Sequence, residues 1–138
     1  MITNQPVIAR NKCTLEELEQ IHNKMETELG ERGAYLDTIK FCPHHPDSGY
    51  PEERREYKIK CNCRKPATGL IEEAVREFNI EKTDSYMIGD TTTDIQTGIN
   101  AGLKTILVQT GENGKDGKYQ VAADLTAPDL LAAIQRIE

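Results

Sequence analysis

Apolar residues recur at helical spacing in two segments. Residues 14–30 carry Leu15, Leu18, Ile21, Met25 and Leu29 on one face. Thr14 and Glu17 match a capping box, so we predict an amphipathic helix that starts there and ends near Gly30. In residues 68–79, a second face predicts another helix, which Thr68 starts and Asn79 ends; this face is formed by Leu70, Ile71, Ala74, Val75 and Phe78.

Short apolar runs between the helical segments predict strands. Residues 1–4 have the pattern of the end of a strand, and residues 35–41, 85–88 and 105–108 have the pattern of whole strands. A helix is expected at 94–101, before Gly102. A closing helix has Pro128 in its first turn and is lined by Leu130, Leu131, Ile134 and Ile137. Residues 111–118 form a Gly/Lys turn. This alternation predicts an α/β fold with a mostly parallel sheet, in which ligands gather at the carboxyl ends of the strands.

Length and charge narrow the possible functions. A chain of 138 residues suits one domain spanning 1–138. Its net charge of −6 argues against nucleic acid or an anionic membrane as partner. Residues 1–69 are neutral and residues 70–138 carry the whole negative charge, so an anionic ligand should favour the first half. Because no apolar run reaches the roughly 20 residues of a membrane span and no secretory signal is evident, we expect a cytoplasmic protein.

Cysteine and histidine cluster around a long polar segment. The polar segment covers residues 43–60. Cys42 directly precedes it, His44 lies at its start, and Cys61 and Cys63 follow it. Three thiols and one imidazole are the ligand set of a closed structural zinc site, which would brace this loop. Free thiols or a disulfide are the alternatives, although a bridge between Cys61 and Cys63 would be strained. His45 could replace His44 as the fourth ligand.

Three short segments carry groups suited to phosphate and magnesium. Thr3, Asn4 and Gln5 offer a hydroxyl and amides at a strand end. Arg64 and Lys65 offer two adjacent cations directly after the cysteines, or else form a solvated basic turn.

The third segment follows a predicted strand. Asp90 ends the buried strand at 85–88, and Asp94 comes one helical turn later. The pair suits Mg²⁺, with one carboxylate as a direct ligand and the other supporting it from the second shell. The alternative for Asp90 is a helix N-cap.

Together these segments resemble the haloacid dehalogenase superfamily of phosphatases, and within it the D-glycero-D-manno-heptose 1,7-bisphosphate phosphatases. The resemblance rests on residues 3–10 (TNQPVIAR), 41–46 (FCPHHP), 61–66 (CNCRKP) and 89–94 (GDTTTD), and extends through Gly98, 101–102 and 110–111. It implies a Rossmann-like core with an inserted zinc loop at 42–63. Pro6 and Val7 stand where relatives often have smaller residues.

The resemblance implies a role for each matching residue. Thr3 and Lys65 would stabilise the transferring phosphoryl group. Substrate contacts would come from Thr3, Asn4, Gln5, Pro6, Arg64 and Lys65. Asp90 would bind Mg²⁺, Asp94 would lie in its second shell, and Zn²⁺ would be held by Cys42, His44, Cys61 and Cys63. The implied reaction removes the 7-phosphate of a heptose bisphosphate through an aspartyl-phosphate, and the expected partner is this small sugar bisphosphate, with the protein a monomer.

One expected motif is missing from the sequence. The superfamily's nucleophile and general acid belong to an Asp-x-Asp motif on the first, central strand, whereas the first Asp here is Asp37 and no Asp-x-Asp occurs. We therefore expect an N-terminally truncated phosphatase domain that lacks this strand. The alternatives are a histidinol-phosphate phosphatase, which shares the zinc loop, and a non-catalytic, zinc-stabilised remnant that binds sugar phosphates.

Overall fold

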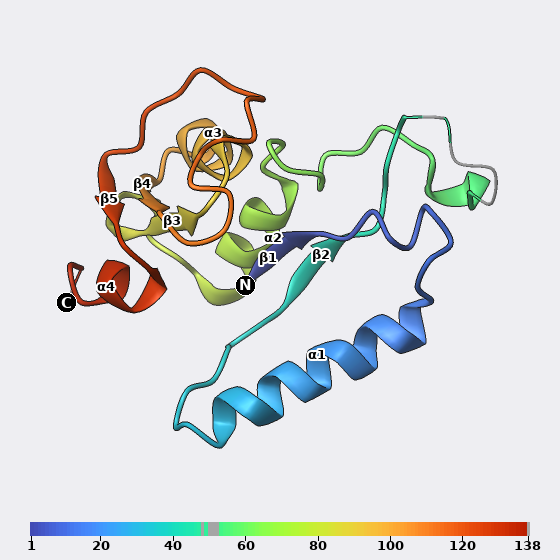
Figure 1. Cartoon of the computed structure of the whole chain (residues 1–138), viewed down its shortest axis with the longest axis horizontal. Coiled ribbons are helices and arrows are strands. Elements are labelled where there is room, and N and C mark those ends of the chain that lie inside the picture. The colour runs from blue at the N-terminus through green and yellow to red at the C-terminus, as the bar shows by residue number, and fades with distance from the viewer. Residues whose placement is uncertain (48, 50–52, 138) are drawn as a thin grey trace. The chain divides into compact units, whose positions relative to one another are not determined.

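The computed structural model describes residues 1–47, 49 and 53–137, which form two compact units, Met1–Arg64 and Lys65–Glu138 (Figure 1). The first unit has a two-stranded sheet of β1 (Ile2–Asn4) and β2 (Lys40–Cys42). The second has three strands in the order β3 (Tyr86–Gly89), β4 (Lys104–Val108), β5 (Leu125–Ala127). Every pair is parallel, which confirms the predicted α/β class. The missing central strand and the single-domain organisation stay predictions.

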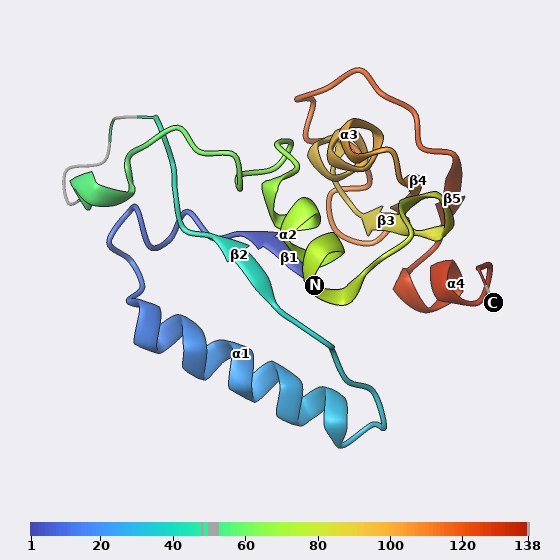
Figure 2. The same ribbon diagram turned by 180° about the vertical axis from the view of Figure 1, so that it is seen from behind.

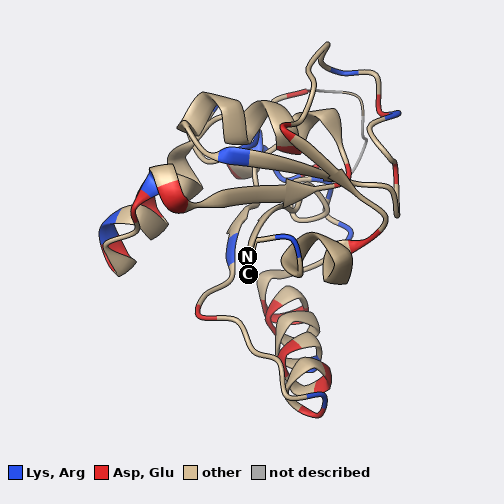
Figure 3. Ribbon diagram, turned by 90° about the vertical axis from the view of Figure 1, so that its left-hand side faces the viewer, with Lys and Arg blue, Asp and Glu red and all other residues tan. Residues whose placement is uncertain are grey.

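In the first unit, α1 (Leu15–Gly30) lies alongside β2 (Figure 1). The predicted capping box is present: Glu17 N–H donates to Thr14 Oγ1 at 3.1 Å, and Thr14 N–H donates to the Glu17 carboxylate at 2.8 Å. Leu18 is buried, and the rings of His22 and Phe41 lie 5.7 Å apart. Figure 3 shows the acidic residues along the rest of this helix, as expected for a solvated face.

Strand β2 is shorter than the sequence predicted. Residues 35–41 have a strand-like pattern, but only Lys40–Cys42 pair, in the register Ile2–Lys40, Thr3–Phe41 and Asn4–Cys42. The reason is that β1 offers three residues, so within the described chain residues 35–39 have no strand beside them. The register places Asn4 and Cys42 together at the carboxyl edge of this sheet.

In the second unit, α3 (Thr92–Ala101) packs on β3 and β4 (Figure 2). It starts two residues before the predicted residue 94, because Thr91 is the N-cap and forms a capping box with Asp94. Gly98 permits the close packing, since a Cβ there would lie 2.6 Å from Thr105 Cγ2. The helix ends at Gly102 in the left-handed conformation, as predicted.

The rest of the second unit departs from the prediction near the C-terminus. Helix α2 (Gly69–Phe78) matches, with Asn79 as a left-handed C-cap. Strand β5 was not predicted, and α4 (Leu130–Ile134) is shorter than expected. Pro128 does not lie in the first turn of α4, because the Asp129 side chain caps the helix by accepting from Ala132 N–H at 2.8 Å. The core here consists of Ile106, Val108, Ala127 and Ala133.

The polar segment at residues 43–60 contains one short 3-10 helix, Arg55–Tyr57, and another, Lys82–Asp84, precedes β3. Residues 48 and 50–52 of the predicted loop lie outside the described residues. Among the helices that the structure describes, none has the length and apolar character needed to cross a bilayer.

Candidate metal centre and phosphate-site residues

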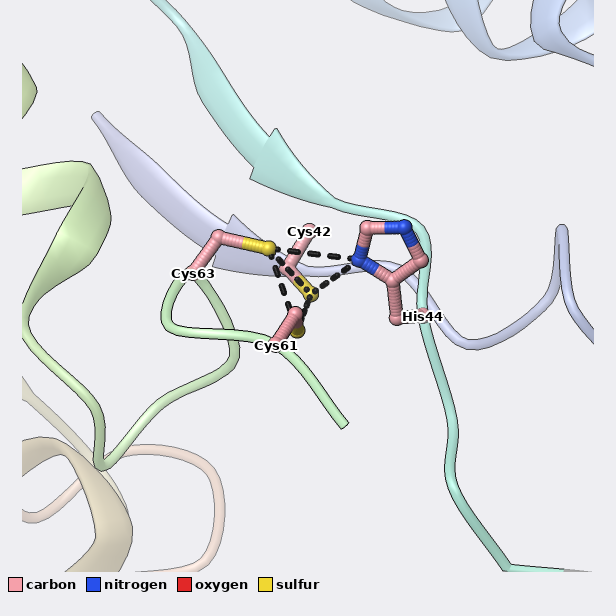
Figure 4. Close-up of side chains that lie close together, drawn as sticks. All are labelled: Cys42, His44, Cys61 and Cys63. Atoms are coloured by element: carbon pink, nitrogen blue, oxygen red, sulfur yellow. Dashed lines mark hydrogen bonds between the residues drawn. The ribbon is translucent and has the colours of Figure 1, made fainter. Parts of the chain in front are cut away.

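The four predicted zinc ligands converge in the first unit (Figure 4). Their ligand atoms all lie within 4.8 Å of one another. The sulfur of Cys63 is 3.1 Å from that of Cys42 and 3.2 Å from that of Cys61, and the sulfurs of Cys42 and Cys61 are 3.5 Å apart. His44 Nδ1 lies 3.3 Å from Cys63 Sγ and 3.7 Å from Cys42 Sγ.

These distances fit a tetrahedral zinc ion. Zn–S bonds of about 2.3 Å and Zn–N bonds of about 2.0–2.1 Å give a ligand tetrahedron with edges of about 3.6–3.8 Å. The S–S distances of 3.1–3.5 Å are shorter than this and the two S–N distances of 3.3 and 3.7 Å are close to it, so an outward movement of the sulfurs would accommodate the ion. Three thiols with one imidazole complete the coordination, and the cluster could therefore hold a structural zinc without an open position.

The thiols influence one another strongly. Burial raises the pKa of Cys42 and of Cys63, and for Cys63 the neighbouring thiols raise the pKa further. Burial also opposes ionisation of Cys61, but hydrogen bonds from Cys63 and Cys42 outweigh it and lower the pKa of Cys61. A bound cation would relieve the repulsion among the sulfurs and stabilise all three as thiolates.

His44, rather than its neighbour His45, joins the cluster. His45 is buried at 8% exposure, and its Nε2 lies 3.1 Å from Arg10 Nη2. Burial, followed by the charges of Arg64 and Arg10, lowers the pKa of His45, so the ring is neutral at pH 7. The structure thus brings His44, and not His45, together with the three cysteines.

Strand pairing connects the zinc ligands with the Thr3–Pro6 segment. Asn4 pairs with Cys42 in the sheet, and Gln5 N–H donates to the Cys42 carbonyl at 2.7 Å. The Gln5 side-chain amide reaches Thr3 Oγ1 at 3.4 Å. Pro6 starts the turn after β1, where its carbonyl accepts from Arg10 N–H at 2.9 Å.

Arg64 contacts the zinc loop directly. Its Nη1 donates to the His44 carbonyl at 3.1 Å. The side chain is therefore anchored on the backbone of His44, one of the four clustered residues.

In the second unit, Lys65 and Asp94 form an ion pair. Lys65 Nζ lies 2.5 Å from Asp94 Oδ1, and the two side chains are 14% and 7% exposed. The second oxygen of Asp94 accepts from Thr91 N–H at 3.1 Å and from the Thr91 hydroxyl at 2.6 Å. With both oxygens engaged, Asp94 holds Lys65 in place, and a role for Asp94 in the second shell of a metal is consistent with this geometry.

Asp90 follows β3 but does not cap α3. The N-cap is Thr91, so the alternative that Asp90 is the helix cap is wrong. Asp90 Oδ2 accepts from Glu112 N–H at 2.9 Å. Its Oδ1 makes no hydrogen bond within the described chain, which leaves one carboxylate oxygen for a cation. Mg²⁺ binds through one or two carboxylates and keeps several waters, so this oxygen fits the ion as one of its ligands.

Two carboxylates that sequence reasoning missed also organise the second unit. Asp116 accepts from Thr92 N–H at 2.7 Å and from the Thr93 hydroxyl at 3.3 Å. Asp124 accepts from both the N–H and the hydroxyl of Thr105, at 2.7 and 2.8 Å. Both lie in segments without apolar periodicity, so the sequence offers no cue to their partners.

The chain is similar to known phosphatases and hydrolases. A family model described as HAD-hydrolase-like matches residues 62–133. The D-glycero-β-D-manno-heptose-1,7-bisphosphate 7-phosphatase of Photorhabdus laumondii is 42% identical over 141 residues, covering 100% of this chain and 73% of that protein. The chain belongs to this family of HAD-like hydrolases. The enzyme of the same name from Escherichia coli K12 is 38% identical, covering 91% of this chain and 68% of its own length.

The comparisons with this HAD-like chain extend to a solved structure. The heptose 1,7-bisphosphate phosphatase of B. bronchiseptica, complexed with magnesium and phosphate, matches with a TM-score of 0.80 and 32% identity, over 99% of this chain and 71% of that one. The D-glycero-β-D-manno-heptose-1,7-bisphosphate 7-phosphatase of Haemophilus ducreyi is 40% identical, and the match covers 81% of this chain and 60% of that protein. The HAD-like chain thus spans about 60–70% of the length of such relatives.

Proposed function

We propose that the chain acts in phosphate monoester hydrolysis and that its substrate is D-glycero-D-manno-heptose 1,7-bisphosphate, from which the 7-phosphate is removed. The observation that carries the proposal is the buried Lys65–Asp94 pair, which lies one helical turn after Asp90 at the end of β3. A cation held in this way suits a transferring phosphoryl group. Relatives of that name support the choice of substrate.

Each residue has a proposed role in this reaction. Lys65 and Thr3 neutralise or hydrogen-bond the phosphoryl oxygens. Substrate contacts come from Asn4, Gln5, Pro6 and Arg64. When bound at Asp90, Mg²⁺ would neutralise the negative charge of the phosphoryl group. The zinc cluster has a structural role and fixes the backbone of Asn4 and Gln5 through Cys42.

The ion pair explains how Lys65 performs its part. The Lys65 side chain is largely buried, and the Asp94 carboxylate, whose Oδ1 lies 2.5 Å from Lys65 Nζ, holds the ammonium group in one position. Asp94 itself is oriented by the capping box at Thr91, so the position of Lys65 depends on the start of α3. Lys65 therefore offers a pre-oriented positive charge without reorganisation during the reaction.

The nucleophile has no assignment among these residues. The family reaction passes through an aspartyl-phosphate, and the sequence has no Asp-x-Asp. The proposed roles of the named side chains are accordingly binding, orientation and charge neutralisation. We further propose a single domain over residues 1–138 that works as a monomer in the cytoplasm.

Phosphate release tests the proposal. The chain, and the chain preceded by a strand that carries Asp-x-Asp, are incubated with Mg²⁺ and either the heptose bisphosphate or histidinol phosphate. We expect turnover only with the added strand, and preferentially of the heptose bisphosphate. Faster hydrolysis of histidinol phosphate would refute the substrate. Turnover by the chain alone would refute the proposed mechanism, because another carboxylate would then be the nucleophile.

Variants of the chain with the added Asp-x-Asp strand test the role of Lys65. Lys65→Met should lower kcat/KM by about 10²–10³, the usual cost of removing one group that stabilises transition-state charge. Lys24→Met is the matched control, since Lys24 is a lysine on α1 with a 78% exposed side chain. Equal activity of Lys65→Met and Lys24→Met would contradict the role of Lys65.

The contact between Arg64 and the Cys/His cluster also fits a second candidate, a protein that binds sugar phosphates without turnover. Its signature would be saturable binding of the heptose bisphosphate by the chain, with no phosphate release from either version. That outcome would replace the hydrolase proposal.

A further inference from the structure

Residues 111–119 form a loop that encloses the start of α3, and we call it the 111–119 loop. Gly114 N–H donates to the Asp90 carbonyl at 2.7 Å, and Glu112 N–H donates to the Asp90 carboxylate at 2.9 Å. Further along, Tyr119 N–H donates to Thr92 Oγ1 at 3.1 Å. The loop therefore contacts both the backbone and the side chain of the proposed magnesium ligand.

Asp116 is the one carboxylate of this loop that points back at α3. It accepts from Thr92 N–H at 2.7 Å and from the Thr93 hydroxyl at 3.3 Å, and both threonines are buried at 8% exposure. The helix N-terminus has N–H groups without helical acceptors, and a negative charge there is favourable. Asp94 caps the same turn, but its oxygens are engaged by Lys65 and Thr91.

The surroundings of Asp116 favour the ionised form of its carboxylate. Although burial opposes ionisation, hydrogen bonds from Thr92 and Thr93 lower the pKa of Asp116, so its carboxylate is ionised at neutral pH. An ionised oxygen accepting an N–H forms a stronger hydrogen bond than a neutral one.

The 111–119 loop packs closely against the Asp90 side chain. Gly111 has a φ of +71°, and a Cβ at this position would collide with Asp90 Oδ2. Because Glu112 and Gly114 donate to Asp90, the orientation of the carboxylate depends on where the loop lies. Among the described loop residues, Asp116 provides the side-chain contact that fixes the loop to α3.

From this arrangement we infer that Asp116 is a positioning residue for Asp90: it fastens the 111–119 loop to the start of α3, and the loop in turn holds Asp90 with Oδ1 directed to a divalent cation. The assignment of Mg²⁺ to Asp90 rests on the proposed function, whereas the fastening of the loop does not.

Two variants with the same change in charge separate hydrogen bonding from electrostatics. Asp116→Ala removes the acceptor, and Asp116→Asn removes the charge but keeps an acceptor oxygen. Amide hydrogen exchange of the full chain is measured at Thr92, Glu112 and Gly114. We expect Asp116→Ala to accelerate exchange at all three amides at least tenfold, and Asp116→Asn to restore most of the protection. Faster exchange at Thr92 alone would overturn the inference, because Asp116 would then be only a local helix cap.

Magnesium binding is read separately, by titrating the amide resonances of Gly89 and Asp90 with Mg²⁺ in the presence of inorganic phosphate. We expect Asp116→Ala to weaken the apparent Mg²⁺ affinity about tenfold and Asp116→Asn to weaken it less. Equal affinity in Asp116→Ala and the unchanged chain would overturn the claim that Asp116 orients Asp90. If neither the unchanged chain nor the version with the added Asp-x-Asp strand responds to Mg²⁺ while the exchange result stands, the proposed function fails and the fastening of the loop does not.

Discussion

Removing one zinc ligand gives the sharpest test of the metal centre. Cys61→Ser deletes a sulfur that lies 3.5 Å from Cys42 Sγ and 3.2 Å from Cys63 Sγ. Structural zinc sites bind with about 10–16 kcal/mol, so an equal share for each of four ligands is about 3 kcal/mol, or about a hundredfold in affinity. The variant should therefore lose zinc in competition with a chelator that leaves the unchanged chain loaded.

Loss of zinc should also make residues 43–60, which lie between the two pairs of ligands, less ordered. A cross-link from Cys42 to Cys61 closes a loop of about 20 residues, which in the chain-entropy model is worth about 3 kcal/mol. In the described part of residues 43–60, His45 is the only buried residue, so no apolar core replaces the metal there. We expect residues 53–60 to exchange their amide hydrogens much faster in the variant, while α3 is unaffected.

Zinc content by mass spectrometry and amide exchange measure the two effects. The matched control is Cys13→Ser, because Cys13 lies outside the cluster and its thiol donates to the Thr14 carbonyl at 3.3 Å. Full zinc content in Cys61→Ser would refute the assignment of the ligand. Equal zinc loss in Cys13→Ser would show that the metal is bound elsewhere.

Two further changes test the second unit. Hydrogen bonds from Thr105 lower the pKa of Asp124, so its stabilising contribution is present above the unfolded pKa of about 3.9 and is lost as the pH falls through the lower, folded value. Asp124→Asn should therefore flatten the fall of the urea midpoint below about pH 4, and an unchanged slope would contradict this. Gly98→Ala should destabilise by about 1–3 kcal/mol, because its Cβ would lie 2.6 Å from Thr105 Cγ2. Gly30→Ala, where a Cβ meets nothing within 4 Å, should leave thermal unfolding unchanged or raise its midpoint; the reverse order of stabilities would refute the packing argument.

Local chemistry made the regular elements predictable. The capping box at Thr14 needs only neighbours in sequence, and the ends of α2 and α3 follow from Asn79 and Gly102. The convergence of the three cysteines and His44 was predictable for a related reason, since residue type and pairing are visible in the sequence. Choosing His44 over His45 needed the structure, because adjacent imidazoles differ only in where the backbone directs them.

Contacts distant in sequence explain what was missed. The length of β2 depends on β1, which is 35 or more residues away and provides three partners. Asp116 and Asp124 accept from residues 19–24 positions earlier, and no periodicity marks such pairs. Strand β5 has an exposed beginning, so its sequence lacks the apolar run by which β3 and β4 were recognised.

Through the register of β1 and β2, a zinc ion at the Cys/His cluster would be coupled to the proposed phosphate contacts. Asn4 is paired with the zinc ligand Cys42, and Gln5 N–H donates to the Cys42 carbonyl. Arg64 is anchored on the carbonyl of His44. A shift of the metal ligands therefore moves three of the proposed substrate contacts through the backbone, although none of them binds the metal. Because β1 and β2 pair over only three residues each, the sheet alone restrains these groups weakly. A zinc ion held by the cluster would supply this rigidity, and we therefore predict that its removal lowers the affinity for phosphate.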